Sequence, residues 1–293
     1  MTNNSLDNLA QWSEPAYWQS CAPDLHVCDP SFISNQKTLD LSANSLAAME
    51  SDLLNVGYTQ YQPNDWDFDI GALAKHIETL QTQGLLPVFS FIYDEYWLLF
   101  AKLRDALGHL LGSDYQTMPA FWTWCLMPGT DDVGFPPHRD RGRVSLFDDG
   151  RAKALTIWIA LTEATPENGC MYLLPATLDP TYNTPDEEEW SLPNNDVRAL
   201  PCPAGTIFCW NQAVLHWGGR SSKRAQEPRI SISVEFQRAD VPAFNKPLLP
   251  NDILPPFELR MKLIALQILQ YKHLYPLSPE LEEFVTHMGL GTA

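Results

Sequence analysis

The middle of the chain, from Phe121 to Phe236, is a succession of short β-rich runs separated by proline and glycine. Aromatic and β-branched residues dominate these runs, and such residues favour pleated strands. The pattern predicts a β sandwich or barrel rather than alternating β and α units. The predicted strands are Phe121–Met127, Ala154–Leu161, Gly169–Pro175, Thr206–Trp210, His216–Trp217 and Ile230–Phe236.

The residues on either side of this β region follow a helical period. Apolar side chains at helical spacing predict helices over Asp69–Gln83, Tyr93–Leu111 and Phe257–Tyr271, and a polar tail is expected after the last of them. The chain has 293 residues, a length compatible with one large domain. We expect residues 1–115 to be helical support, residues 116–240 to be the β core, and residues 241–293 to be a C-terminal helical extension.

Composition and charge exclude several kinds of partner. The net charge of −17 argues against binding to nucleic acid or anionic membranes, because such binding requires clustered cations. The longest apolar stretch, Gly84–Phe100, is interrupted by acids and is too short to span a bilayer. The six cysteines form no CxxC pair, and the first residues lack the basic start and apolar segment of a secretory signal. We therefore expect a cytoplasmic protein with reduced thiols, as a monomer or weak homo-oligomer.

The triplet His138-Arg139-Asp140 and the distant His216 form a candidate metal site. On an extended segment, side chains two residues apart point to the same side, so His138 and Asp140 share a face. Two histidines and one carboxylate leave coordination positions open, which is typical of non-haem Fe(II) oxygenases and not of closed structural zinc sites. A His-x-Asp pair alone is weak evidence, and the alternative for His216 is a buried structural histidine.

The last predicted strand carries a candidate anion-binding pair, Arg229 and Ser231. The guanidinium presents a planar fork of donors that can bind a carboxylate through two parallel bonds, and the serine shares its face of the strand. That face continues with Ser233 and Glu235, which predicts a wet cavity, while the alternate apolar positions are expected to pack on helices. The alternative for Arg229 is an ion pair at the surface.

Several segments between Phe121 and Phe236 resemble the phytanoyl-CoA dioxygenase (PhyH) family of iron(II)- and 2-oxoglutarate-dependent oxygenases. The resemblance rests on Phe135-Pro136-Pro137-His138-Arg139-Asp140, on Glu167-Asn168-Gly169-Cys170 leading to Leu174-Pro175, on Pro203-Ala204-Gly205-Thr206 before an apolar strand, and on His216-x-Gly followed by Arg229. The chain departs from the family at Ala176-Thr177-Leu178, where the family has Gly-Ser-His, and at Thr206, where it has Asp. Neither position is a ligand in the family, so the expected chemistry is unaffected.

The resemblance implies a mainly β fold with flanking helices, in which a double-stranded β-helix (jelly roll, cupin-like) is packed by N- and C-terminal helices. It implies that His138, Asp140 and His216 bind Fe(II), and that Arg229 with Ser231 binds the co-substrate 2-oxoglutarate. A tryptophan on the strand Ala154–Leu161 walls the co-substrate pocket in the family. The matching tryptophan is Trp158, and Thr156 lies on the same face of the strand, so we expect both to contact the co-substrate. The alternative for Trp158 is an aromatic residue of the core.

The implied reaction uses 2-oxoglutarate and O2, yields succinate and CO2, and oxidises an unactivated C–H bond of a small molecule. Hydroxylation is the expected outcome, and desaturation or ring formation are the alternatives. Halogenation is disfavoured, because related halogenases have a small residue where Asp140 stands.

The distribution of charge near the motif suggests a class of substrate. Of the 19 lysines and arginines, five lie in Arg139–Lys153 and four in Arg220–Arg229, whereas the connection Leu178–Val197 is acidic. We expect Arg141 or Arg143 to bind a carboxylate or phosphate of the substrate, and Trp124 to line its pocket.

This reading favours a small anionic or zwitterionic metabolite, such as an amino acid or natural-product intermediate. A solvated basic rim paired with Asp148 and Asp149 is the alternative for these cations. The other functions considered are an oxygenase acting on an acyl-CoA or fatty-acid-like substrate, a non-catalytic module that binds metal and 2-oxoglutarate, and a cupin-like isomerase or hydrolase without a co-substrate.

Overall fold

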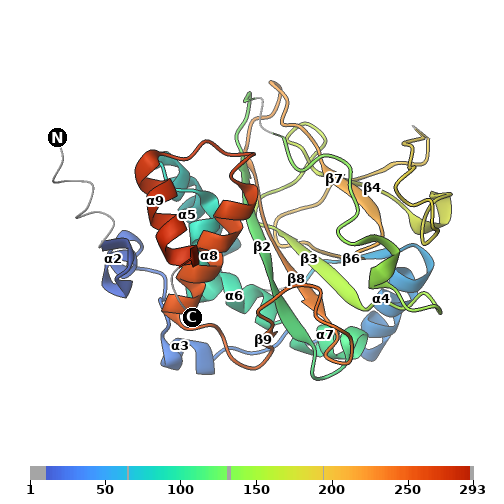
Figure 1. Cartoon of the computed structure of the whole chain (residues 1–293), viewed down its shortest axis with the longest axis horizontal. Coiled ribbons are helices and arrows are strands. Elements are labelled where there is room, and N and C mark those ends of the chain that lie inside the picture. Colours follow the sequence, from blue (N-terminus) through green and yellow to red (C-terminus); the bar gives the residue numbers. More distant parts are fainter. Residues whose placement is uncertain (1–10, 65, 131–132, 194, 291–293) are drawn as a thin grey trace.

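Two antiparallel sheets form the core of the molecule, as the jelly-roll prediction requires (Figure 1). The computed structural model describes residues 11–64, 66–130, 133–193 and 195–290. The larger sheet has six strands in the order β1-β6-β3-β8-β2-β9, and the smaller sheet has three in the order β5-β4-β7. The strands are β1 Tyr58–Tyr61, β2 Gln116–Leu126, β3 Ala154–Ala160, β4 Met171–Leu174, β5 Arg198–Leu200, β6 Ile207–Asn211, β7 Leu215–Gly218, β8 Arg229–Gln237 and β9 Leu249–Pro250.

All six predicted strands are present, and their ends shift by at most two residues, except that β2 begins at Gln116, five residues earlier than predicted. The prediction of residues 1–115 as purely helical support was wrong in one respect. Strand β1 pairs with β6, Tyr58 lying opposite Trp210, so the N-terminal region supplies an edge of the large sheet. Its four residues are too few for an alternating pattern to stand out in the sequence.

Helices cover one face of the large sheet. In Figure 1, α5, α8 and α9 lie on one side of β2, and the small sheet lies on the other. No helix in the described ranges is both long enough and apolar enough to cross a membrane. The α-helices are α2 Pro15–Cys21, α3 Pro30–Ser34, α4 Ala43–Asn55, α5 Ile70–Thr82, α6 Asp94–Ala101, α7 Arg104–Leu111, α8 Phe257–Tyr271 and α9 Pro279–Leu290.

Two helix predictions need correction. The segment predicted as one helix over Tyr93–Leu111 is divided into α6 and α7, and between them the buried ammonium of Lys102 binds Asp67 Oδ2 at 2.7 Å. The C-terminal tail is not a polar extension, because α9 buries Leu281, Phe284 and Val285 in the helical core. The C-terminal segment is therefore part of the layer that covers the sheet.

Strand β8 lies in the middle of the large sheet, between β3 and β2, and separates two environments. Its apolar side chains, among them Ile230 and Ile232, belong to the core shared with the helices. The opposite face, which carries Ser233 and Glu235, lines a cavity. The predicted division of this strand into an apolar and a polar face is thereby confirmed.

Candidate metal centre and its cavity

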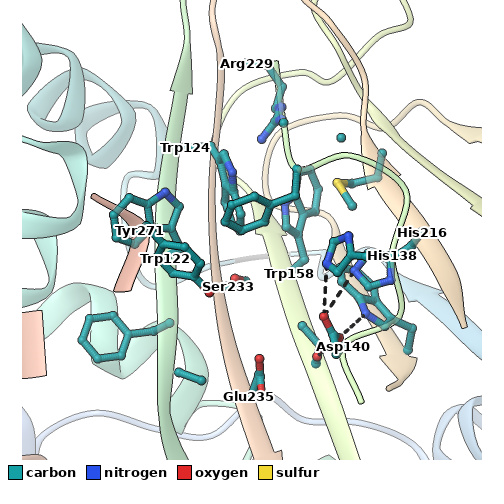
Figure 2. Close-up of a pocket in the computed structure, with 18 residues that line it drawn as sticks. Trp122, Trp124, His138, Asp140, Trp158, His216, Arg229, Ser233, Glu235 and Tyr271 are labelled. Carbon is teal, nitrogen blue, oxygen red and sulfur yellow. Dashed lines mark hydrogen bonds and ion pairs between the residues drawn. The ribbon is translucent and has the colours of Figure 1, made fainter. Parts of the chain in front are cut away.

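The backbone brings His138 and His216 together from segments far apart in the sequence. The two residues form an antiparallel bridge in which each N–H donates to the other's carbonyl oxygen, at 3.0 and 2.9 Å. Asp140 follows two residues later on the same side, and its Oδ1 lies 3.5 Å from His138 Nε2 and 3.6 Å from His216 Nε2 (Figure 2). One donor atom from each residue lies within 4.8 Å of the others, so the three could hold one metal ion.

Hydrogen bonds fix which atoms of these residues face the common centre. His138 Nδ1 lies 2.7 Å from the carbonyl oxygen of Pro136, and His216 Nδ1 lies 3.0 Å from that of Val214. A carbonyl only accepts, so each Nδ1 carries the proton and each Nε2 keeps a lone pair for a metal. This is the arrangement expected of metal-binding histidines.

The carboxylate of Asp140 is oriented in the same way. Its Oδ2 accepts hydrogen bonds from Thr156 Oγ1 at 2.7 Å and from Trp210 Nε1 at 3.1 Å, which leaves Oδ1 for the metal. Thr156 Oγ1 in turn accepts from Gln212 Nε2 at 3.2 Å. The hydroxyl of Thr156, predicted to contact the co-substrate, is thus committed to the carboxylate ligand.

The charge states of His216 and Asp140 suit a divalent cation, whereas His138 would release its proton more readily once a metal is bound. Burial lowers the pKa of His216 to about 4, so its imidazole is neutral at neutral pH. Burial acts in the same sense on His138, but the adjacent Asp140 outweighs it and the pKa of His138 is raised. Burial would raise the pKa of Asp140, yet His216 and His138 hold it below its ordinary value, so this carboxyl group is ionised. A metal requires such deprotonated ligands.

Arg229 is a buried cation without a carboxylate partner among the described residues. Its Nε donates to Gly169 O at 3.1 Å, its Nη1 donates to Ser231 Oγ at 2.7 Å, and burial lowers its pKa to about 10. The guanidinium lies about equally far from the rings of Trp124 and Trp158, at 6.0 and 5.9 Å from their centres. The alternative of a surface ion pair is therefore wrong.

The surroundings of Arg229 fit a dicarboxylate ligand. Burying a guanidinium without an anion is costly, and a bound carboxylate would offset that cost through charge-assisted bonds. The indole Nε1 of Trp158 is also buried and has no hydrogen-bond partner among the residues that the structure describes, so it offers a second donor beside Arg229. A ligand with a carboxylate at each end could bind here and reach the metal ligands.

These groups line one cavity with an empty volume of about 590 Å³, its open mouth included. Figure 2 shows Arg229 and Glu235 at opposite ends, with the histidines and Asp140 along one side and Trp122 and Tyr271 along the other. The lining residues are Ala120, Phe121, Trp122, Trp124, Gly134, Phe135, His138, Asp140, Thr156, Trp158, Met171, Trp210, His216, Gly218, Arg229, Ser233, Glu235 and Tyr271.

The three residues predicted to contact the substrate differ in their position relative to the cavity. Trp124 lines the cavity, as predicted. Arg141 is engaged with Glu235, its Nη2 lying 2.8 Å from Oε2, and Arg143 is exposed outside the cavity. Neither arginine is among the residues that line the cavity. The proposed pairing of the basic rim with acids is seen in Arg151, which binds Asp149 at 2.8 Å.

The acidic connection Leu178–Val197 lies against the basic segment of the metal motif. Arg139 binds Asp179 at 2.8 Å, and both side chains are almost fully buried. Glu187 Oε2 accepts from the backbone N–H of Arg143. Because the two segments compensate each other's charge, their composition no longer supports an amphoteric substrate.

Trp210 and Tyr271 line the cavity but were not predicted from the sequence to be part of the site. Trp210 is the last residue of a predicted strand, and its indole donates a hydrogen bond to Asp140. The sequence does not show that β6 pairs with β3 in the register that places Trp210 opposite Thr156. Tyr271 comes from the last turn of α8, in the region predicted to be only helical covering. The helical period marked its segment correctly but contains no signal that this one side chain reaches the cavity.

Comparisons with known proteins agree with this geometry. The model of the phytanoyl-CoA dioxygenase (PhyH) family matches residues 40–226. No curated protein sequence matches the chain. At the identities below, structural similarity establishes the fold only. EctD from S. alaskensis is 17% identical, with 79% of this chain and 94% of that chain covered and a TM-score of 0.52. The non-haem monooxygenase ThoJ in a nickel complex is 12% identical, with 80% of this chain and 99% of that chain covered and a TM-score of 0.53. EvdMO1 is 21% identical, with 66% of this chain and 50% of that chain covered and a TM-score of 0.52.

Proposed function

The chain belongs to the phytanoyl-CoA dioxygenase family, and on that premise we propose how its cavity works as that of an iron(II)- and 2-oxoglutarate-dependent oxygenase. His138, Asp140 and His216 hold the iron, while Arg229 and Ser231 bind the distal carboxylate of 2-oxoglutarate. When bound, iron and 2-oxoglutarate supply the oxidation of a C–H bond by O2, with succinate and CO2 as co-products. Hydroxylation is the proposed outcome, with desaturation or ring formation as alternatives, and halogenation is disfavoured because Asp140 keeps a carboxylate where a halogenase needs room for halide.

One observation carries the co-substrate assignment: a buried guanidinium, unpaired with any described carboxylate, lies in the same cavity as the three metal ligands. An isomerase or hydrolase that needs no co-substrate gives Arg229 no role. The other residues have supporting tasks. Thr156 and Trp210 orient the carboxylate ligand, and the indole of Trp158 donates to the co-substrate. The aromatic walls exclude water from the reacting groups.

The substrate is a small molecule that binds beside Trp122, Trp124 and Tyr271, which line the cavity. A purely anionic substrate, and an acyl-CoA in particular, is disfavoured because Arg139 and Arg141 are already paired with acids. Of the classes considered, we retain the zwitterionic metabolites, such as amino acids. A cytoplasmic location, a monomeric or weakly oligomeric state and a single oxygenase domain are further proposals from the sequence.

The first test is anaerobic reconstitution with iron(II) and 2-oxoglutarate. The wild-type protein should develop the weak visible charge-transfer band of the chelated complex. Arg229→Ala should bind iron but require at least about tenfold more 2-oxoglutarate for the same band, because a charge-assisted bidentate contact is lost. Arg224→Ala, which removes an exposed arginine of the same segment, is the matched control and should titrate like the wild type.

Two other outcomes would change the assignment. No band in the iron-loaded wild type would remove 2-oxoglutarate from the mechanism and favour the enzymes that need no co-substrate. A band without 2-oxoglutarate decarboxylation, under O2 and across a panel of amines and amino acids, would favour the binding module.

A further inference from the structure

The end of the cavity remote from Arg229 contains a carboxylate with one uncommitted oxygen (Figure 2). Glu235 lies on the same face of β8 as Ser231 and Ser233. Its Oε2 accepts from Arg141 Nη2 at 2.8 Å and from Gln212 Nε2 at 3.0 Å. No donor in the described ranges reaches its Oε1, and the residue lines the cavity. Oε1 is therefore available to a hydrogen-bond donor on a substrate.

Aromatic rings form the wall beside this carboxylate. Tyr271 packs on Trp122 and on Phe135, with ring centres 4.8 and 5.0 Å apart, and all three residues line the cavity. The faces of aromatic rings attract cations, and a carboxylate adds a directional, charge-assisted hydrogen bond. The combination of rings and a carboxylate is suited to an ammonium group.

The local charges disfavour an anion at the same place. Arg141, the cation in contact with Glu235, is engaged with that carboxylate and stacks over the ring of Phe244, 5.4 Å from its centre. Asp140 brings a second carboxylate into the cavity. A substrate carboxylate placed here would face two acids and would have to displace Glu235 from its own partner.

We propose that Glu235, together with Ser233 and the rings of Trp122, Phe135 and Tyr271, forms a subsite for a protonated amino group of the substrate. The inference rests on the proposed function, since it places that group across the cavity from the co-substrate and beside the metal ligands. Glu235 is then a specificity-determining residue that selects amines over isosteric alcohols and acids.

The test compares three probes that share a phenyl ring and a short chain but differ in their end group: phenethylamine, phenethyl alcohol and hydrocinnamate. Binding is measured by calorimetry, with the metal-free protein and with the anaerobic protein loaded with iron(II) and 2-oxoglutarate. In wild type, the amine should bind at least about tenfold more tightly than the alcohol, as expected for one charge-assisted bond, and the acid should bind most weakly.

Glu235→Gln keeps the shape of the side chain and removes its charge, so it should abolish the preference for the amine. Glu163→Gln, which changes an exposed glutamate in a loop, is the matched control and should keep the preference for the amine. Circular dichroism of each variant establishes that it is folded, and the wild-type comparison of the three probes does not depend on any variant. A preference for the amine that survives Glu235→Gln would move the subsite elsewhere in the cavity and contradict the proposal.

If the amine binds wild type no better than the other two probes, including the case in which none binds, the proposal is wrong. The charge-transfer band separates this failure from failure of the proposed function. A normal band with no amine preference leaves the oxygenase assignment intact and removes the subsite. If the amine is preferred but no charge-transfer band forms, the subsite is supported and 2-oxoglutarate is removed from the proposed mechanism.

Discussion

Two acidic side chains in the cavity, Asp140 and Glu235, have opposite shifts of pKa. Both are largely shielded from solvent, with side chains 11% and 19% exposed, and such shielding alone raises the pKa of a carboxyl group. The imidazoles of His216 and His138 overcome that effect at Asp140 and hold its pKa low. At Glu235, burial and the nearby charge of Asp140 outweigh the pairing with Arg141, and the pKa rises to about 7. In one cavity, therefore, one carboxyl group is a permanent anion and the other changes charge near neutral pH.

The raised pKa of Glu235 predicts a pH-dependent stability of the metal-free protein. Its pKa is about 7 when folded and about 4.5 in the unfolded chain, so the folded state holds the proton more tightly. The resulting stabilisation is complete below about pH 4.5 and is lost as the pH rises through about 7. Glu235→Gln has no such loss. The free energy of unfolding of Glu235→Gln minus that of wild type should therefore be larger at about pH 8 than at about pH 5, by about 1–3 kcal/mol.

Thermal and urea unfolding of both proteins without metal would measure this difference. Glu163→Gln should differ from wild type equally at both pH values, because its side chain is exposed. A difference between Glu235→Gln and wild type that does not change with pH would show that Glu235 is ionised throughout.

The role of Thr156 can be decided by separating metal affinity from co-substrate affinity. Thr156→Val keeps the volume of the side chain but removes the 2.7 Å hydrogen bond to Asp140. We expect about tenfold weaker binding of metal, the usual effect of losing a group that orients a ligand. Competition titration with cobalt(II) would measure it, with the exposed Thr177→Val as control. Unchanged metal binding with weaker 2-oxoglutarate binding would instead favour the direct co-substrate contact predicted from the sequence.

At the scale of elements, the C-terminal helices have two tasks. Helix α8 covers the large sheet and also delivers Tyr271 to the cavity. Helix α9 packs beside it, and its Phe284 lies edge-on to Trp12, with ring centres 5.1 Å apart. The extension therefore links the stability of the helical layer to the wall of the site.

Truncation of Phe284 should measure the contribution of α9. Phe284 is 5% exposed, so Phe284→Ala should lower the free energy of unfolding by about 3–5 kcal/mol through lost burial and a residual cavity. Ile253→Ala, at a side chain that is 65% exposed, should change it by less than about 0.5 kcal/mol. Urea denaturation would compare them, and similar small effects would mean that α9 does not belong to the cooperative core.

At the scale of the whole molecule, the cavity exists because two sheets meet and the helices close only one face. The apolar face of β8 packs on the helices, whereas its polar face meets side chains from the small sheet and from the metal motif. The net charge of −17 gives no indication of the interior, where charges are arranged in local pairs such as Arg139 with Asp179 and Arg141 with Glu235.

The sequence by itself determined the strands β2, β3, β4, β6, β7 and β8, the three candidate metal ligands and the candidate anchor Arg229, but not the strands β1, β5 and β9. Strand period and ligand chemistry are carried by neighbouring residues or by short motifs, so they can be recognised without coordinates. Only the tertiary structure decided which charged groups are available to a ligand. Arg141 was expected to bind substrate and is instead paired with Glu235, and Tyr271 reaches the cavity from a helix that resembled simple covering. Whether a side chain is available to a ligand depends on its contacts with segments that are distant in the sequence, and a local sequence pattern contains no information on those contacts.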